Sequence, residues 1–351
     1  MAQQVQQPVE APAGGGRAGL DPRDRALRIA SRNARTIAPL ATFVAMFVFF
    51  SLVTDVFFTV GNLQNIVTQI GPVAVAAAGV TFVLLCAEID LSIASVATFS
   101  GVMAAYFFHP DHLDRGYWGI LVAVLAAAGI GLLNGFLVAY IGIPSFMMTL
   151  AMLTIAIGLA QYVTEGRIID AKGVPPVLED LASVGNRVLG IPVIGLVALG
   201  VLIICDIVLS YTKFGRYVFM TGGNREAAEM SGVNTKQVVM LSLMISSLTA
   251  GLAGMLFIGR LHSANPGAGA ELLIQTIAAV VLGGTSLFGG EGGIKNTLIG
   301  LLIFGILSNG LNLIEGLSIH FKDALEGIIL VGALLLNVLA LRLEKVRVRT
   351  E

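Results

Sequence analysis

The chain has 351 residues, of which 56% are hydrophobic and only 12% are charged. Since a soluble domain carries about 25% charged residues, this composition excludes a protein whose surface faces only water. The net charge of −1 excludes no class, because in membrane proteins the placement of charge matters more than its sum.

The first segment of the chain, residues 1–36, is predicted to be a cytoplasmic tail that is disordered and basic. Residues 1–20 are rich in Gln, Pro, Ala and Gly, a composition typical of disorder. Five arginines follow between Arg23 and Arg35. They indicate either a short helix that lies against anionic lipid head groups or a solvated segment that only orients the chain.

Apolar runs then fill the chain from residue 37 to residue 343. A helix needs about 20 mostly apolar residues to cross the hydrocarbon core of a bilayer. The runs therefore predict an all-α fold, a polytopic transmembrane helical bundle of about ten spans, followed by a cytoplasmic tail over residues 344–351. The predicted spans are Ile37–Val53, Ile66–Ala87, Leu91–Phe108, Tyr117–Tyr140, Pro144–Val163, Gly190–Leu209, Val238–Ile258, Leu272–Ser286, Asn296–Ile314 and Asp323–Leu341.

Two regions of this bundle, 86–95 and 283–295, are compatible both with full crossings and with broken or re-entrant helices. In the first region, Glu88 and Asp90 are two positions apart, which favours a broken helix over a shared carboxylate pair. The first region contains Glu88 and Asp90, and the second is rich in glycine. Irregular backbone survives at membrane depth only where protein or a watery cavity covers it. The glycine-rich region is equally consistent with a tight turn and with a gating element.

The basic residues predict the orientation, because cytoplasmic segments carry an excess of Lys and Arg. With ten spans and both termini in the cytoplasm, 15 of the 21 basic residues lie inside and 6 lie outside. The longest outside loop is then 164–189, and the longest inside connection is 210–237.

The inside connection contains a sequence typical of a short capped helix. Asn224 suits the N-cap, Glu226 follows in the first turn, and Gly232 suits the position that ends the helix. Gly222 and Gly223 are expected to let the chain turn sharply before it. By itself this pattern favours an ordinary capped helix in a loop over a helix that docks into a groove of another protein.

This connection resembles the coupling-helix region of permeases from ATP-binding-cassette sugar importers of the ribose, xylose and arabinose type. Met220 and Val233 depart from the family pattern. The residues that match it are Thr212, Phe214, Gly215, Arg216, Gly223, Asn224, Ala227, Ala228, Ser231 and Gly232.

Further motifs of the family occur in the same order, so the resemblance extends from about residue 60 to residue 340. Ile89-Asp90-Leu91-Ser92 is similar to its first motif, although Glu88 and Ala94 stand where glycines are usual. The other matching segments are Pro144–Met152, Glu271–Gly292 and Asn309–Leu313.

The resemblance implies a permease subunit that forms the path of a monosaccharide or polyol through the bacterial plasma (inner) membrane. It implies three partners: ATPase subunits, a second copy or a paralogue of the chain, and an outside solute-binding protein. The expected ATPase-coupling residues are Gly223, Asn224, Arg225, Glu226, Ala227, Ala228, Ser231 and Gly232.

The chain itself is not expected to be an enzyme or to hold a cofactor. It lacks the phosphate-binding pattern G-x-x-x-x-G-K-[ST], so ATP is expected to bind to the partner subunit. No metal site is predicted either: His109 and His112 are close in sequence, but they lack a thiolate partner.

Seven polar residues are candidates for the solute pathway. Carboxylates at membrane depth indicate function by default, although a head-group position fits them equally well. Buried amides bind either solute hydroxyl groups or neighbouring helices, and the second use is the commoner. The candidates are Glu88, Asp90, Ser92, Asn134, Gln275, Asn309 and Asn312.

Two other functions remain open at this stage. A branched-chain amino-acid permease has the same kinds of partner, and a cation-coupled secondary transporter would use Glu88 and Asp90 as ion sites. The sequence does not name the solute, and it does not decide between a homodimer and a heterodimer.

Overall fold

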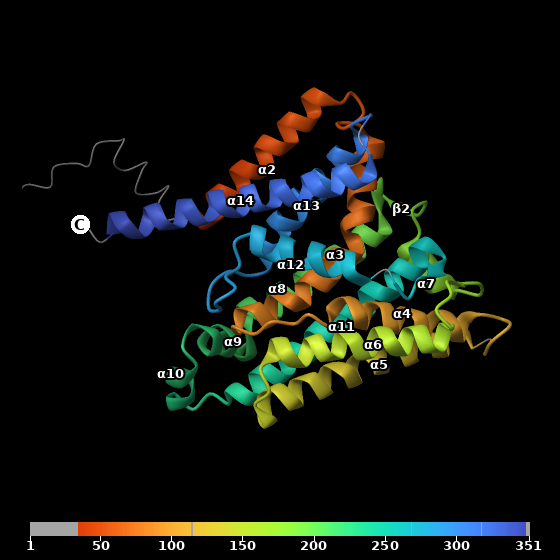
Figure 1. The fold of residues 1–351 in the computed structure, drawn as a ribbon, viewed down its shortest axis with the longest axis horizontal. Coiled ribbons are helices and arrows are strands. Elements are labelled where there is room, and N and C mark those ends of the chain that lie inside the picture. The colour runs from red at the N-terminus through yellow and green to blue at the C-terminus, as the bar shows by residue number, and fades with distance from the viewer. Residues whose placement is uncertain (1–33, 114, 268, 317, 349–351) are drawn as a thin grey trace, which may run out of the picture.

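The computed structural model describes residues 34–113, 115–267, 269–316 and 318–348, and these residues are predominantly helical (Figure 1). Most of the predicted N-terminal tail, residues 1–33, lies outside the described residues, whereas residues 34–36, with Arg35, already belong to the first described helix. The long helices are α2 (Ala34–Val53), α3 (Val60–Leu85), α4 (Ile93–Phe108), α5 (Gly116–Phe136), α6 (Ser145–Thr164), α8 (Val193–Tyr211), α11 (Thr235–Leu261), α12 (Gly269–Leu282), α13 (Ile294–Leu313) and α14 (Ile319–Val348).

The shorter elements connect these helices. A π-helical turn, η1, extends α5, and two helices, α9 and α10, form the connection between α8 and α11. Two strand pairs are present, in which β1 pairs with β4 and β2 with β3, both antiparallel. Their bounds are η1 (Leu137–Ile141), β1 (Ile169–Asp170), α7 (Pro176–Ala182), β2 (Arg187–Val188), β3 (Ile191–Pro192), α9 (Lys213–Gly223), α10 (Arg225–Met230) and β4 (Ser263–Ala264).

The all-α polytopic architecture is confirmed, and each of the ten apolar runs coincides with one long helix. Six helical segments of the described chain are long and apolar enough to cross a membrane: Val60–Leu85, Gly116–Ile141, Ser145–Thr164, Val193–Tyr211, Thr235–Leu261 and Ile294–Leu313. The chain is therefore a multi-pass membrane protein. Ten crossings remain a prediction, because the apolar parts of α2, α4 and α12 are shorter. The last predicted span lies within α14, which continues as helix past residue 343.

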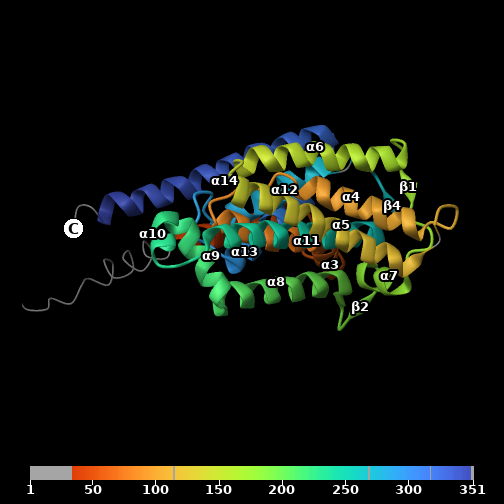
Figure 2. The ribbon, with the colours of Figure 1, turned by 90° about the horizontal axis from the view of Figure 1, so that it is seen from below.

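The connections gather at two opposite ends of the molecule (Figures 1 and 2). One end carries α9, α10 and the C-terminal part of α14, and we call it the α10 end. The opposite end carries α7 and both strand pairs. The alternation of the connections between the two ends is the one that the predicted topology requires; that the α10 end is the cytoplasmic one remains a prediction from the basic residues.

The centre of the bundle is built from α3 and α11. In their most apolar stretches, 83% and 67% of the residues are buried, against 28% in α6 and α8. Small residues allow α11 to approach its neighbours closely. A Cβ atom on Gly131 of α5 would lie 2.8 Å from the Met244 Cα, and one on Gly254 would collide with the Ala97 carbonyl oxygen of α4. These glycines of α5 and α11 are therefore packing sites.

Candidate functional site

The chain between α3 and α4 is the first of two irregular segments that reach the α10 end. The α3 helix ends in a Schellman motif, in which the Glu88 N–H donates to the Val83 carbonyl (3.1 Å) and the Ala87 N–H to the Leu84 carbonyl (2.9 Å). Ala87 adopts a φ of +60° at the position where glycine is usual. Residues 86–92 then run without helix to the start of α4. The predicted helix break is confirmed, and we call residues 86–92 the α3–α4 break.

Asp90 lies at the centre of this break and is only 1% exposed. Its Oδ1 accepts hydrogen bonds from the Ser92 N–H (2.9 Å) and the Ser92 hydroxyl (2.6 Å), and its Oδ2 accepts one from the Ser246 hydroxyl of α11 (2.8 Å). The Asn134 amide of α5 donates to the Ser92 hydroxyl at 3.1 Å. Three of the predicted pathway residues, Asp90, Ser92 and Asn134, therefore belong to one buried network.

The network leaves one acceptor unused. The Asn134 Oδ1 is buried and has no hydrogen-bond partner among the described residues. Buried polar atoms normally have a partner in the protein or in ordered water. This oxygen is therefore available to a donor that enters the bundle, such as water or a hydroxyl group.

Helix α6 holds the backbone of the same break. The Ser145 hydroxyl accepts from the Ile89 N–H at 3.1 Å, and the Thr149 hydroxyl lies 3.2 Å from the Ile89 carbonyl oxygen, to which it can donate. Both residues belong to the segment Pro144–Met152, one of the motifs singled out in the sequence. Two of these motifs thus bind each other in the fold.

Glu88 points out of the break toward α10. Its Oε1 lies 2.7 Å from the Nη2 of Arg225, and the same guanidinium group donates to the Cys86 carbonyl at 3.4 Å. The Glu88 side chain is 12% exposed and that of Arg225 is 47% exposed. Glu88 and Asp90 therefore do not form a carboxylate pair, and each is bound to a different helix.

Helix α10 forms where the sequence predicts a short capped helix. The Asn224 side chain accepts from the Ala227 N–H (2.9 Å), and Gly232 follows the helix with a φ of +81°. The expected turn at Gly222 and Gly223 is wrong, because both residues lie in the last turn of α9 and the chain bends at Asn224. Most of the predicted coupling residues are exposed, Gly223, Arg225, Glu226 and Ala227 among them, whereas Ala228 is buried.

The second irregular segment, 283–293, meets α9 and the end of α3. The Gly290 N–H donates to the Leu85 carbonyl at 3.0 Å. A Cβ atom on Gly222 would collide with that carbonyl oxygen, and one on Gly290 would lie 2.7 Å from the Gly223 Cα. Both irregular segments therefore touch the backbone that leads into α10. We call this meeting of Leu85–Glu88, Gly222–Arg225 and Gly289–Gly290 the inner junction.

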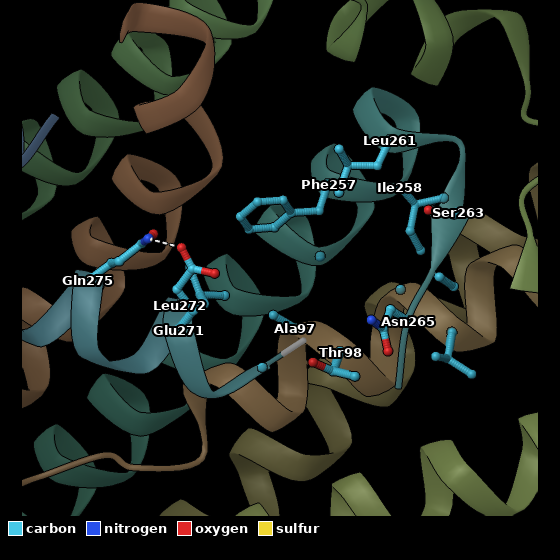
Figure 3. Close-up of a pocket in the computed structure, with 15 residues that line it drawn as sticks. Ala97, Thr98, Phe257, Ile258, Leu261, Ser263, Asn265, Glu271, Leu272 and Gln275 are labelled. Carbon is cyan, nitrogen blue, oxygen red and sulfur yellow. Dashed lines mark hydrogen bonds between the residues drawn. The ribbon is translucent and has the colours of Figure 1, made fainter. Parts of the chain in front are cut away.

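A pocket of about 200 Å³ opens in the half of the bundle nearer the opposite end (Figure 3). Its walls come from α4, α11, the β4 segment and α12. Most of the lining is apolar, including the Phe257 ring. Its polar side chains are Thr98, Ser263, Asn265, Glu271 and Gln275, with the Gln275 amide donating to the Glu271 carboxylate at 2.6 Å. We call it the outer pocket.

The predicted residues Asn309 and Asn312 lie outside both sites. The Asn309 Oδ1 accepts from the Asn62 amide of α3 at 2.9 Å, and both side chains are buried. Asn309 thus joins α13 to α3, which is the commoner use of a buried amide. The Asn312 side chain is exposed, and its carbonyl oxygen accepts from Lys322 at 3.0 Å.

Comparison with known proteins places the chain in a family. A model described as the permease component of a branched-chain amino acid transport system matches residues 62–334. The chain belongs to this permease family.

Its relatives include permeases named for sugars. The ribose import permease protein RbsC of Haemophilus influenzae is 36% identical over 85% of this chain and 93% of the relative. RbsC of Bacillus subtilis is 34% identical over 86% and 92%. The D-allose transport system permease protein AlsC of Escherichia coli is 31% identical over 85% and 89%. No solved structure matches significantly.

Several residues of the two sites in this permease are absent from the predicted set. Ser246 of α11 donates a hydrogen bond to Asp90, and the pair Ser246-Ser247 within an apolar span is the sequence signal that could have indicated it. Thr98 and Asn265 line the outer pocket. They are isolated polar residues, and only the packing of α4 against α11 and α12 brings them to Gln275.

Proposed function

We propose that this permease is the membrane-spanning subunit of an ATP-driven importer for a monosaccharide or a related polyol. A separate solute-binding protein delivers the solute, and a second copy or paralogue completes the pathway. The bacterial plasma membrane, with both termini in the cytoplasm, is its proposed location. The observation that carries the proposal is the exposed helix α10, which is ion-paired to the α3–α4 break inside the bundle.

Helix α10 has the features of a docking element for an ATPase subunit. It is short, capped and exposed along Gly223–Ala227, and the small Ala227 side chain allows a groove to approach closely. The inner junction connects it to both irregular segments. Since the chain has no phosphate-binding loop of its own, we assign ATP hydrolysis to that partner.

The outer pocket supports a polyhydroxylated solute. Glu271, Gln275, Thr98 and Asn265 offer acceptors and donors for hydroxyl groups, and Phe257 offers an apolar face for a sugar ring. A branched-chain amino acid would bring a carboxylate, yet no Lys or Arg is among the pocket-lining residues and Glu271 would repel it. The sugar names of the relatives point the same way.

Ligand binding by the partner protein tests the solute class. The solute-binding protein of the importer would be screened by thermal shift against ribose, allose, xylose, inositol and leucine, followed by uptake into vesicles that hold the assembled importer. A shift with a sugar or polyol, with ATP-dependent uptake of the same compound, is expected. A response to leucine alone would overturn the proposed solute class, and uptake driven by an ion gradient without ATP would favour a secondary transporter.

Co-purification tests the docking of the ATPase. Ala227→Arg places a long charged side chain on the exposed face of α10 and is expected to abolish recovery of the ATPase with the permease. Gly185→Arg is the matched control, because Gly185 is exposed and lies in the chain between α7 and β2, which are at the opposite end of the molecule. Equal recovery of the ATPase with both variants would contradict docking at α10.

A further inference from the structure

We infer that the Glu88–Arg225 ion pair is the positioning contact that transmits movement of α10 to the α3–α4 break, and thereby couples ATP hydrolysis to solute movement. The inference rests on the proposed function and goes beyond it, because it assigns the transmission to one pair of side chains. Neither residue is expected to touch the solute or ATP.

The position of Glu88 in the chain explains how a movement of its side chain would reach the α3–α4 break. It is followed directly by Ile89, whose backbone is bonded to α6, and by Asp90, whose carboxylate is bonded to α11. A displacement of the Glu88 side chain therefore acts on a segment that three helices hold by hydrogen bonds. Within the break, the backbone of residues 89–91 forms no hydrogen bond to the backbone of α3 or α4, so these described residues can change conformation without unwinding either helix.

The position of Arg225 explains how a movement of α10 would reach Glu88. It is the first residue of α10, so it moves with that helix as a unit. Its guanidinium group donates hydrogen bonds to both the Glu88 carboxylate and the Cys86 carbonyl, so it is bonded at two points to the segment that follows α3. Arg225 is the described residue that joins α10 to the α3–α4 break by side-chain bonds.

Space for a movement is present beside the pair. A cavity of about 330 Å³ lies against Glu88 and Arg225 and is lined as well by Gly142, Glu229 and Lys236. It separates α10 from the corner between η1 and α6. The cavity allows α10 to shift relative to α6, whereas the ion pair keeps α10 attached to the break.

The partial exposure of the ion pair makes it possible to distinguish a role in positioning α10 from a role in stabilising the fold. The Arg225 side chain is 47% exposed and that of Glu88 is 12% exposed, so solvent screens the ion pair from one side and lowers its contribution to the stability of the fold. Replacing one partner by glutamine is therefore expected to leave a folded permease. A merely structural pair would leave the amount of solute moved per ATP hydrolysed unchanged.

The test compares four forms of the assembled importer in proteoliposomes: wild type, Glu88→Gln, Arg225→Gln and the double variant with both charges exchanged (E88R/R225E). Uptake of ribose and ATP hydrolysis are measured in the same samples. Each single variant is expected to hydrolyse ATP while uptake per ATP falls at least about five-fold, the lower range of measured couplings between sites. The exchanged pair is expected to recover most of the loss. The control is Arg167→Gln, which removes an ion pair with Glu165 that is exposed at the opposite end.

Each outcome decides between the two proposals. Unchanged uptake per ATP in both single variants overturns the inference and leaves the proposed function standing, and so does a loss that the exchanged pair does not recover. A wild-type importer that moves neither ribose nor another sugar with ATP overturns the proposed function together with the inference. Gel filtration of each variant identifies any that fails to fold. Arg225→Lys, which keeps the charge, then replaces Arg225→Gln and is expected to retain more uptake per ATP than Glu88→Gln.

Discussion

The inner junction and the outer pocket are two polar regions of the described residues, and they are built in opposite ways. At the inner junction and the adjoining break, polar groups are bonded to one another: Asp90 accepts three hydrogen bonds, and Glu88 is ion-paired. In the outer pocket the polar side chains form few hydrogen bonds: the Gln275 amide donates to Glu271, and the Asn265 Oδ1 accepts from the Gly267 N–H. The same bundle thus holds one polar region whose groups are bonded to one another and one polar region whose groups are mostly free to bind a solute.

The difference follows from what each region is proposed to do. A region that transmits force must keep its parts together, so each polar group needs a fixed partner. A region through which a solute passes needs groups that bind weakly and exchange partners, because a solute that binds tightly does not leave. Substitutions at the inner junction should therefore change stability or coupling, and substitutions in the outer pocket should change uptake alone.

The largest effect is expected for Asp90→Leu. This change removes the acceptor of the Ser92 N–H and of two hydroxyl groups, and each buried donor left without a partner costs about 1–3 kcal/mol. We expect a loss of at least about 3 kcal/mol in the free energy of unfolding, measured by thermal unfolding in detergent. Asp90→Asn keeps an acceptor of the same shape and is expected to lose less. Equal stability of the two variants would show that the network does not hold the break.

Two adjacent glycines give the next effect. A Cβ atom on Gly222 would collide with the Leu85 carbonyl oxygen, whereas one on Gly223 meets no atom within 4 Å. Gly222→Ala is therefore expected to destabilise the permease by about 1–3 kcal/mol, as overpacking does, and Gly223→Ala is expected to have little effect. Similar melting temperatures for the two variants would contradict the close contact at the inner junction.

The outer pocket predicts a loss of uptake without a loss of stability. Glu271→Ala removes a hydrogen-bond acceptor for hydroxyl groups, and we expect ribose uptake at low concentration to fall about ten-fold, which corresponds to about 1.4 kcal/mol. Ile274→Ala on the same helix is the control, because Ile274 is exposed and does not line the pocket. If both variants transport like the wild type, the solute does not pass Glu271.

The smallest effect is an increase in stability. Ala87 has a φ of +60° at the end of α3, a conformation that glycine adopts more readily. We expect Ala87→Gly to raise the free energy of unfolding by about 0.5–1 kcal/mol. The opposite change at Gly232, which has a φ of +81° and no atom near its Cβ position, should lower it by about 1 kcal/mol. A lower melting temperature for Ala87→Gly would show that the packing of the Ala87 methyl group outweighs the backbone strain.

Much of the fold followed from the sequence, because local rules decide it. The length and polarity of the apolar runs predict each long helix, and Asn224 and Gly232 predict where α10 begins and ends. Glu88 and Asp90 indicate the α3–α4 break, since two carboxylates do not suit the middle of an apolar span. The turn expected at Gly222 was wrong because close packing, rather than a turn, requires a glycine there.

The partners of these residues were decided only by the tertiary structure. Asp90 and Ser246 are 156 positions apart, and Glu88 and Arg225 are 137 positions apart. No local pattern pairs residues at such distances, because the pairing depends on how α3, α10 and α11 pack. The sequence by itself thus determined a multi-pass helical permease with a capped helix between two spans. The packing of its helices determined that this helix is joined to the break and that the outer pocket lies apart from it.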